Sequence, residues 1–296
     1  MKSKSLVSID QCSKEDILRI LDNARKFEEN PNRKLLEGKV AATLFFEPST
    51  RTRLSFETAV NRLGGRVVGF QDASTTSSSK GETLKDTILM VSNYVDLIIM
   101  RHRLEGAARY ASEVTDVPII NAGDGGHNHP TQTLTDLLTI HRERGELNNF
   151  TIGFCGDLKF GRTVHSLIRA MAAFPGNSFV LISTPDLGIP PYIKDYLAAS
   201  GCSYQEMDNL AEAMPLLDVL YMTRIQQERF ASPEGYERQK GVYVLDAPKM
   251  KRAKKDLVVL HPLPRVDEIT VEVDDDPRAK YFEQTEYGLY ARMALI

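Results

Sequence analysis

One stretch of the chain reads Phe46-Glu47-Pro48-Ser49-Thr50-Arg51-Thr52-Arg53, and it separates an apolar run from a helical pattern. The run before it, Val40–Phe46, has the composition of a buried strand. Pro48 interrupts the chain, because proline lacks a backbone N–H and fixes its own φ. Beyond the break, apolar residues recur at helical spacing, at Phe56, Ala59, Val60 and Leu63. The order strand, turn and helix therefore sets hydroxyl and guanidinium groups at the N-terminus of a helix.

The Ser-Thr-Arg-Thr-Arg group at residues 49–53 predicts a site for an anion. Helix N-termini present free backbone N–H groups and the positive end of the helix dipole. Hydroxyl donors and a guanidinium fork add to these, and phosphate is the anion that such a set suits best. The alternative is an ordinary N-cap, which would use the Ser49 hydroxyl but would need no arginine.

The length and composition of the chain are those of a soluble globular protein. Its 296 residues suit about two domains, with 42% hydrophobic and 26% charged residues. A net charge of −3 gives no general attraction to nucleic acids or anionic membranes. No apolar run is long enough to span a bilayer, and the N-terminal sequence is not that of a signal peptide. The 3 scattered cysteines argue against a disulfide framework and for a reducing, cytoplasmic compartment.

Strand-like runs alternate with helical patterns along nearly the whole chain, which predicts an α/β fold with two doubly wound parallel-sheet domains. The predicted strands are Val40–Phe46, Arg66–Phe70, Leu97–Met100, Pro118–Asn121, Thr151–Cys155, Phe179–Ser183, Val219–Met222 and Val258–Leu260. The predicted helices include Lys14–Glu28, Leu84–Tyr94, Gly106–Thr115, Thr131–Gly145, Thr163–Ala173, Pro191–Ser200 and a terminal helix at Glu286–Ile296. The polar segment Glu143–Asn149 is a candidate boundary between the two halves. Ligands are expected outside the carboxyl ends of the strands.

In the first half, two predicted strands run into polar clusters. One is followed by Arg101-His102-Arg103, which is either a cation facing the ligand crevice or a solvated basic turn. The next is followed by a glycine-rich segment that ends in His129-Pro130, at the start of a helix. Asp124, His127 and His129 raise a metal site as an alternative, but their spacing matches no zinc motif. A neutral imidazole at a helix start serves equally well as a hydrogen-bond donor.

In the second half, two strand ends each present an arginine. Thr151–Cys155 leads to Arg162 at the start of a helix, and Val219–Met222 leads to Arg224 with Gln226 beyond it. Arginines with a glutamine in a crevice suit bidentate recognition of carboxylates, although each arginine taken alone is as well explained as a surface residue. Farther on, His261-Pro262-Leu263-Pro264-Arg265 is a rigid connection whose backbone carbonyls suit a donor such as an amine.

The two halves therefore offer different anion sites, one for a phosphate and one for carboxylates. No serine or cysteine nucleophile with a partnered base is recognisable, and no paired acids are obvious. Such a combination suits the transfer of an already activated group, in which positioning and electrostatics do most of the work.

Motifs along nearly the whole chain, in order, resemble those of aspartate carbamoyltransferase catalytic chains. They are Phe46–Arg53, Lys80-Gly81-Glu82-Thr83, Arg101-His102, His129-Pro130-Thr131-Gln132, Gly161-Arg162-Thr163, Thr223-Arg224-Ile225-Gln226 and His261–Arg265. The resemblance implies transfer of a carbamoyl group from carbamoyl phosphate to the α-amino group of L-aspartate. The products would be N-carbamoyl-L-aspartate and phosphate, in de novo pyrimidine synthesis.

The resemblance also implies how the two domains share the work. Residues 1–130 would bind carbamoyl phosphate and residues 131–285 would bind aspartate, with the active site in the cleft between them. The terminal helix, residues 286–296, would pack back on the first domain.

A role for each motif residue follows from the same resemblance. The catalytic residues would be Arg51, Thr52, Arg101 and His129, of which the last three would donate to the carbonyl oxygen as charge develops on it. Carbamoyl phosphate would be bound by Ser49, Thr50, Arg51, Thr52, Ser77, Lys80, Arg101, His129, Gln132, Leu263 and Pro264. Aspartate would be bound by Lys80, Arg162, Thr163, Arg224 and Gln226. Glu47 would tie the two domains together through Arg162 and Arg229 when substrates bind.

The implied assembly is a homotrimer with shared active sites. Lys80 and a nearby hydroxyl would reach the neighbouring subunit's site; Ser77 is the first choice for this hydroxyl, with Thr76 and Ser78 as alternatives. No cofactor and no metal are expected on the chain. Zinc-containing regulatory chains accompany some members of the family, and the sequence leaves open whether they bind here.

Two other functions compete with this interpretation. Ornithine carbamoyltransferases share the phosphate motif, but they typically carry Ser-Met-Gly and His-Cys-Leu-Pro motifs that are missing here. Arg224 would also repel the side-chain amine of ornithine. A non-catalytic scaffold of the same fold would be expected to lose Arg51, Thr52, Arg101 or His129, and all four are present.

Overall fold

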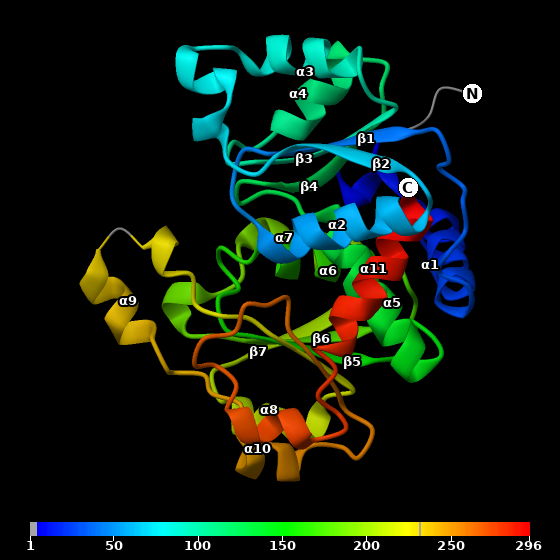
Figure 1. Ribbon diagram of the computed structural model, residues 1–296. Coiled ribbons are helices and arrows are strands. Elements are labelled where there is room, and N and C mark those ends of the chain that lie inside the picture. The colour runs from blue at the N-terminus through cyan, green and yellow to red at the C-terminus, as the bar shows by residue number, and fades with distance from the viewer. Residues whose placement is uncertain (1–4, 231) are drawn as a thin grey trace. The chain divides into compact units, whose positions relative to one another are not determined.

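The computed structural model of the chain describes residues 5–230 and 232–296. The chain falls into two compact units, Met1–Leu138 with Glu286–Ile296, and Thr139–Thr285. Each unit is built on its own parallel sheet (Figure 1). Among the described residues, none of the helices combines the length and the apolar character that a bilayer-spanning segment needs.

The first unit contains a 4-stranded parallel sheet with the strand order β2-β1-β3-β4. Its strands are β1 Val40–Phe45, β2 Arg66–Phe70, β3 Leu97–His102 and β4 Ile119–Asp124. The helices that begin or lie in this unit are α1 Lys14–Glu29, α2 Thr50–Arg62, α3 Leu84–Ser92, α4 Ala107–Val114 and α5 Pro130–Arg144. The terminal helix α11, Glu283–Leu295, belongs to this unit from Glu286 onward.

Helices cover both faces of the first sheet (Figure 1). On one face, Ala42 and Leu44 of β1 are buried with residues of α3 and α4. On the other face, Ala41 and Phe45 of the same strand are buried with residues of α2. Successive residues of a strand point to opposite faces, so a strand buried on both sides has to be apolar throughout. This is why Val40–Phe45 reads as a continuous apolar run.

The second unit contains a 5-stranded parallel sheet with the order β7-β6-β5-β8-β9. Its strands are β5 Thr151–Cys155, β6 Ser178–Ile182, β7 Ser203–Met207, β8 Val219–Met222 and β9 Val258–Leu260. Its helices are α6 Arg162–Ala172, α7 Pro191–Ala199, α8 Leu210–Ala213, α9 Pro233–Gln239 and α10 Ala247–Arg252.

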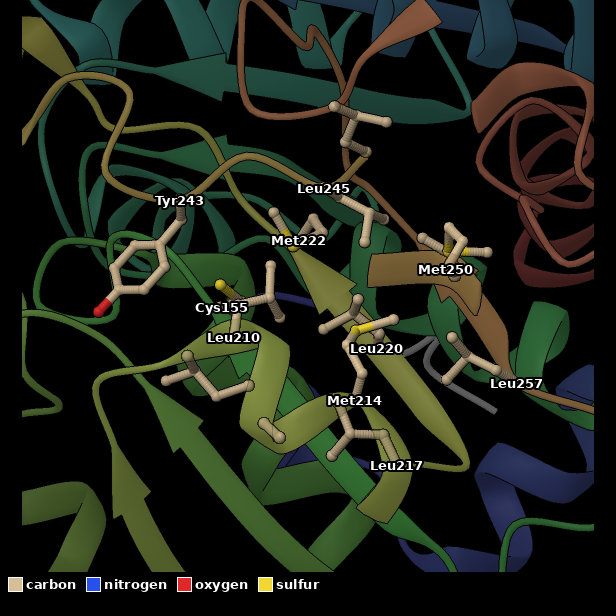
Figure 2. Close-up of a cluster of buried hydrophobic side chains, with 14 of the residues drawn as sticks. Cys155, Leu210, Met214, Leu217, Leu220, Met222, Tyr243, Leu245, Met250 and Leu257 are labelled. Carbon is tan, nitrogen blue, oxygen red and sulfur yellow. The ribbon is translucent and has the colours of Figure 1, made fainter. Parts of the chain in front are cut away.

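One face of the second sheet carries a large apolar cluster, part of which is drawn in Figure 2. Cys155 of β5 and Met222 of β8 lie in it together with Leu210 of α8 and Met250 of α10. Burial raises the pKa of the Cys155 thiol, so this cysteine stays protonated and acts as a small apolar side chain. The cluster anchors the inner strands β5 and β8, whose carboxyl ends carry the polar residues described below.

The predicted fold class, two doubly wound parallel sheets, is confirmed. Every predicted strand is present, with bounds that differ at most by a few residues. Strand β7 was missed because it is an exposed edge strand, Ser-Tyr-Gln-Glu-Met, and lacks the apolar run of a buried strand. The expected boundary after residue 130 also differs, because the two units divide within α5, after Leu138.

Candidate active site

The turn between β1 and α2 has the geometry that an anion site needs. Ser49 is the N-cap residue of α2, and its hydroxyl makes no capping hydrogen bond. The ordinary N-cap alternative is therefore wrong for Ser49, because an N-cap side chain accepts from the first turn. Thr50 and Arg51 are exposed, Thr52 is buried, and the first turn contains no acidic residue. The N-terminus of α2 thus keeps its backbone donors and its positive dipole available to an anion.

Arg101 lies beside this turn, at the end of β3. Its Nη2 is 3.1 Å from Oε2 of Glu47, and its Nη1 donates to the carbonyl of Ala122 at 3.5 Å. Only 12% of its side chain is exposed. Burial lowers the pKa of Arg101, and the charge of Glu47 opposes that shift. A guanidinium remains charged under such conditions, so Arg101 is a fixed and largely desolvated cation.

His129 packs against Gly123, as Arg101 does. A Cβ on Gly123, which has a φ of +120°, would lie 2.8 Å from Nη1 of Arg101 and 3.3 Å from Cδ2 of His129. Only glycine lets both side chains pack this closely on β4. Nδ1 of His129 accepts from the backbone N–H of Gln132 at 3.3 Å. A neutral ring held in this way carries its proton on Nε2 and acts there as a donor.

Asp124 organises the loop that leads to His129. Its carboxylate accepts from the backbone N–H groups of Gly106 at 2.8 Å and Asn128 at 3.0 Å, and from the side chain of Asn121 at 3.1 Å. These bonds account for a buried acid in a glycine-rich turn. Within the described residues, no group of three or more His, Cys, Asp or Glu side chains is arranged to hold a metal ion.

Gln132 belongs to a chain of polar contacts within the first unit. Its Nε2 donates to Oδ1 of Asp136 at 2.7 Å. Asp136 is fully buried, and its charge acts on Arg292 of α11, which is also buried. Burial lowers the pKa of Arg292 to about 10, and Asp136 opposes that shift. Sequence reasoning missed Asp136 and Arg292, since an acid and a base on two distant helices carry no local motif.

The polar loop of the first unit contains the 3-10 segment Ser77–Lys80. Ser77 and Lys80 are both exposed. The hydroxyl of Thr76 donates to the carbonyl of Ala73 at 2.7 Å, so it serves the loop itself. Between the two described candidates, this favours Ser77 over Thr76 as the hydroxyl available to another molecule.

In the second unit, Asp157 joins the ends of two neighbouring strands. It follows β5, and its backbone N–H donates to Oγ1 of Thr223 after β8 at 3.1 Å. Its carboxylate accepts from the backbone N–H of Phe160 at 2.9 Å and of Gln226 at 3.5 Å. Burial raises the pKa of Asp157, and these backbone hydrogen bonds oppose the shift. Sequence reasoning gave Asp157 no role, because its partners lie on another strand.

Gly156 allows the two loops to come this close. A Cβ at this position would lie 2.3 Å from the carbonyl oxygen of Thr223, and the φ of Gly156 is +121°. Both the space and the backbone conformation therefore require glycine. The contact aligns the loop that precedes Arg162 with the loop that carries Arg224 and Gln226.

The predicted carboxylate-binding residues lie on these two loops. Arg162 and Thr163 begin α6 after β5, while Arg224 and Gln226 follow β8, and all four are partly exposed. Arg224 and Thr223 line a cavity of about 160 Å³. Arg229, expected to act in domain closure, is exposed in the 3-10 segment Gln227–Arg229. Glu47, the other residue expected to act there, is paired with Arg101.

A buried histidine and glutamate shape the loop around Leu263 and Pro264. Nε2 of His261 is 2.6 Å from Oε1 of Glu268, and Nδ1 of His261 accepts from the backbone N–H of Leu263 at 2.8 Å. Burial alone would raise the pKa of Glu268, but the hydrogen bond and charge of His261 outweigh it and hold that pKa below its usual value. Leu263 has a φ of +52°, held by these contacts. Because β9 pairs with β8, this loop follows the strand next to the one that leads to Arg224.

The fold and these residues define a two-domain α/β protein with an uncapped helix N-terminus after a strand of one sheet and arginines after two strands of the other. The chain belongs to the aspartate/ornithine carbamoyltransferase family. The carbamoyl-P binding domain of that family matches residues 4–142, and its Asp/Orn binding domain matches residues 148–296.

Individual relatives agree with this assignment. The aspartate carbamoyltransferase catalytic subunit of Parabacteroides distasonis is 66% identical over 100% of this chain and 97% of its own length. The catalytic subunit of M. jannaschii aspartate transcarbamoylase has 51% identity and a TM-score of 0.92, over 99% of this chain and 96% of its own. A Trypanosoma cruzi aspartate transcarbamoylase in complex with carbamoyl phosphate and aspartate has 40% identity and a TM-score of 0.93, over 99% and 95%.

Proposed function

We propose that this chain transfers the carbamoyl group of carbamoyl phosphate to the α-amino group of L-aspartate. The products are N-carbamoyl-L-aspartate and phosphate, and the reaction is a step of de novo pyrimidine synthesis. The observation that carries the proposal is the combination of an uncapped helix N-terminus after β1 with arginines after β5 and β8. Relatives that share 54–66% identity are named for this activity.

The first unit is assigned to carbamoyl phosphate. Backbone and hydroxyl donors of residues 49–52 bind its phosphate, with the guanidinium of Arg51. Thr52, Arg101 and Nε2 of His129 donate to the carbonyl oxygen, which becomes more negative as the tetrahedral intermediate forms. Fixed donors of this kind cost no reorganisation at the moment of reaction, which is what the desolvated Arg101 and the oriented His129 provide.

The remaining contacts to carbamoyl phosphate are directed at its amino group. Gln132 and the carbonyl of Leu263 accept from the carbamoyl N–H groups, and Pro264 holds the backbone at Leu263. Lys80 and Ser77 contribute from a neighbouring copy of the chain.

The second unit is assigned to aspartate. Arg162 and Thr163 of α6, with Arg224 and Gln226 of the β8 loop, bind its two carboxylates, and Lys80 assists. Arginine suits this task, because its planar fork donates two parallel hydrogen bonds to one carboxylate. Glu47 and Arg229 are assigned to domain closure, for which the Glu47–Arg101 pair would have to exchange partners.

The chemistry needs no covalent intermediate with the protein. The neutral amine nitrogen of aspartate attacks the carbonyl carbon, so a C–N bond forms and the C–O bond to phosphate breaks. The amine proton passes to the departing phosphate, which Arg51 still holds. The chain contributes position and charge, which are worth several orders of magnitude in rate when reactants are held in line.

We infer that the working assembly is a homotrimer in the cytoplasm. An apolar groove of about 400 Å³ in the first unit is lined by Val68, Phe70, Met90 and Tyr94, and also by Ser77. Val68, Met90 and Tyr94 are exposed large apolar residues, which a second copy would cover. Free thiols at Cys12, Cys155 and Cys202 support a reducing compartment.

The direct test identifies the product. Purified protein is incubated with labelled carbamoyl phosphate and either aspartate or ornithine, and the products are separated by mass. We expect N-carbamoyl-L-aspartate and phosphate, and no reaction with ornithine. Citrulline as the only labelled product would contradict the proposal, and absence of any product would favour a non-catalytic scaffold.

A further inference from the structure

The hydrogen bond between Gln132 and Asp136 fixes which end of the glutamine amide faces the site. The two residues are one turn apart on α5, and Nε2 of Gln132 is 2.7 Å from Oδ1 of Asp136. An ionised carboxylate only accepts hydrogen bonds, so the amide must present its NH2 group to Asp136. Its carbonyl oxygen Oε1 is then at the opposite end and acts as an acceptor.

Asp136 can hold this orientation because a buried cation, Arg292, interacts with its charge. The side chain of Asp136 is fully buried, and a buried carboxylate stays ionised only when it is paired or well hydrogen-bonded. The charge of Arg292 acts on it from α11. Arg292 is itself held in place, since Nη1 donates to Oγ of Ser55 at 3.0 Å and the guanidinium lies 5.2 Å from the ring centre of Phe56.

The terminal helix is packed closely enough to keep this cation in place. A Cβ on Gly288 of α11 would lie 3.0 Å from Thr135 on α5 and 2.8 Å from Arg292. Glycine at this position therefore lets α11 approach α5 directly, and Figure 1 shows the red terminal helix beside α5 and α2. A segment remote in sequence from the phosphate motif thus supports a residue of the carbamoyl phosphate site.

We propose that Asp136, neutralised by Arg292, is a positioning residue that orients the Gln132 amide and thereby selects an acyl phosphate that carries an N–H donor. The inference rests on the role assigned to Gln132 above. A glutamine amide without a fixed partner presents either its carbonyl oxygen or its NH2 group to a ligand. If the NH2 group faced the amino group of carbamoyl phosphate, two hydrogen-bond donors would meet and no hydrogen bond would form. With Asp136 in place, only the acceptor end is presented.

Acetyl phosphate is the matched probe for this selection, because a methyl group replaces the amino group and the phosphate is retained. The quantity to measure is the inhibition constant of acetyl phosphate divided by the KM of carbamoyl phosphate. We expect Asp136→Ala to lower this ratio about tenfold, the scale of one lost hydrogen bond. A defect confined to the phosphate site would weaken both ligands and leave the ratio unchanged.

A double-mutant cycle separates orientation of Gln132 from a general effect on packing. Gln132→Ala removes the acceptor itself and should lower the ratio by a similar factor. In that background, Asp136→Ala should change the ratio less than twofold, because the group through which it acts is gone. If Asp136→Ala lowered the ratio by the same factor whether or not Gln132 is present, the proposal would be overturned.

Stability is controlled with two further variants. Asp136→Ala leaves Arg292 buried without this partner, which is strongly destabilising, so Asp136→Ala/Arg292→Met removes both charges together. This double variant should fold and still show the lowered ratio. Ser55→Ala removes a different bond of Arg292 and should lower the unfolding midpoint while the ratio stays that of the wild type.

The outcomes distinguish this inference from the proposed function. A wild-type protein that does not carbamoylate aspartate would remove the proposed function, and this inference with it. A wild-type protein that prefers carbamoyl phosphate, combined with a folded Asp136 variant of unchanged ratio, would overturn the positioning role alone.

Discussion

Arg101, to which a catalytic role is assigned above, is held in a fixed position by the fold itself. Its guanidinium is largely removed from water, is paired with Glu47 and packs on Gly123 together with His129. Each contact restricts the side chain. The free-energy cost of fixing a cation where the carbonyl oxygen of the substrate is expected is therefore met during folding. The Ser49 hydroxyl is a parallel case, since α2 begins without using it as a cap.

Arg101→Ala should lower kcat by about 100-fold or more, the scale of one lost transition-state donor, with the fold retained. The reason is that Arg101 is assigned to the oxygen on which charge develops. Arg103→Ala is the matched control, because it removes the same charge from an exposed position two residues away. Steady-state kinetics at saturating substrates measures both, and a kcat close to wild type in Arg101→Ala would remove this role.

Arg224→Ala should raise the KM for aspartate while the KM for carbamoyl phosphate stays close to its wild-type value. Arg224 lies on the β8 loop with Gln226 in the second unit, whereas the residues assigned to phosphate belong to the first unit. Arg252→Ala, an exposed arginine of the same unit, is the control for loss of charge. If aspartate bound equally well to Arg224→Ala, the diacid would have to be recognised elsewhere.

The residues that the sequence singled out and those that emerged only from the structure differ in one physical respect. Ser49, Arg101, Arg162 and Arg224 follow buried strands, so a local pattern is enough to predict that they face a ligand. Asp157, Asp136 and Arg292 act through partners on other elements, and those partners are brought together only by folding.

At the scale of elements, the loop between β5 and α6 is held by a histidine of the helix it precedes. Nε2 of His165 donates to the carbonyl of Leu158 at 2.7 Å, and the hydroxyl of Tyr192 lies 2.9 Å from Nδ1. The neutral ring of His165 donates through Nε2 and accepts through Nδ1, so it forms a hydrogen bond with each partner. Burial lowers the pKa of His165, and the bond to Leu158 opposes that shift.

The free energy of unfolding should therefore fall as the pH drops below 6.5, the ordinary pKa of histidine. The folded pKa lies below that value, so the unfolded chain takes up the proton first and is stabilised by it. His165→Gln should lose this component, which amounts to at most about 1.4 kcal/mol per pH unit. Urea unfolding at pH 7.5 and 5.5 measures the difference, with His127→Gln, an exposed ring, as control. Equal pH dependence in wild type and His165→Gln would contradict this account.

Buried helices and strands could be predicted from the sequence more clearly than exposed ones. The inner strands β1, β5 and β8 are covered on both faces and read as apolar runs, so their positions follow from composition. Strand β7 lies at an edge and is polar, and the short helices α8 to α10 have too few turns for a clear period. The loop around Leu263 was predictable as rigid, but the His261–Glu268 pair that shapes it was not.

At the scale of the whole molecule, the proposed trimer completes the active site with residues of a neighbouring copy. The groove that contains Val68, Met90 and Tyr94 is continuous with the loop that carries Ser77. Burying this surface against a second copy would place the exposed Ser77 and Lys80 next to the neighbouring subunit. Light scattering should give a mass of three 33.2 kDa chains, or a multiple of that trimer.

Hybrid trimers test whether sites are shared. Lys80→Ala and Arg51→Ala chains should each be inactive as homotrimers, because each lacks a group assigned to every site. Mixed trimers should recover part of the activity, since some sites then combine an intact Lys80 from one chain with an intact Arg51 from another. Absence of recovery in hybrids verified by native mass spectrometry would count against sharing.

The central claim is that one anion site binds the phosphate and the other binds the amino diacid. A crystal structure of this protein with N-(phosphonacetyl)-L-aspartate, a ligand bound by a Trypanosoma cruzi relative, tests it most directly. The phosphonate should accept hydrogen bonds from residues 49–52, and the carboxylates should lie against Arg162 and Arg224. A phosphonate bound away from the N-terminus of α2, or carboxylates far from both arginines, would contradict the account.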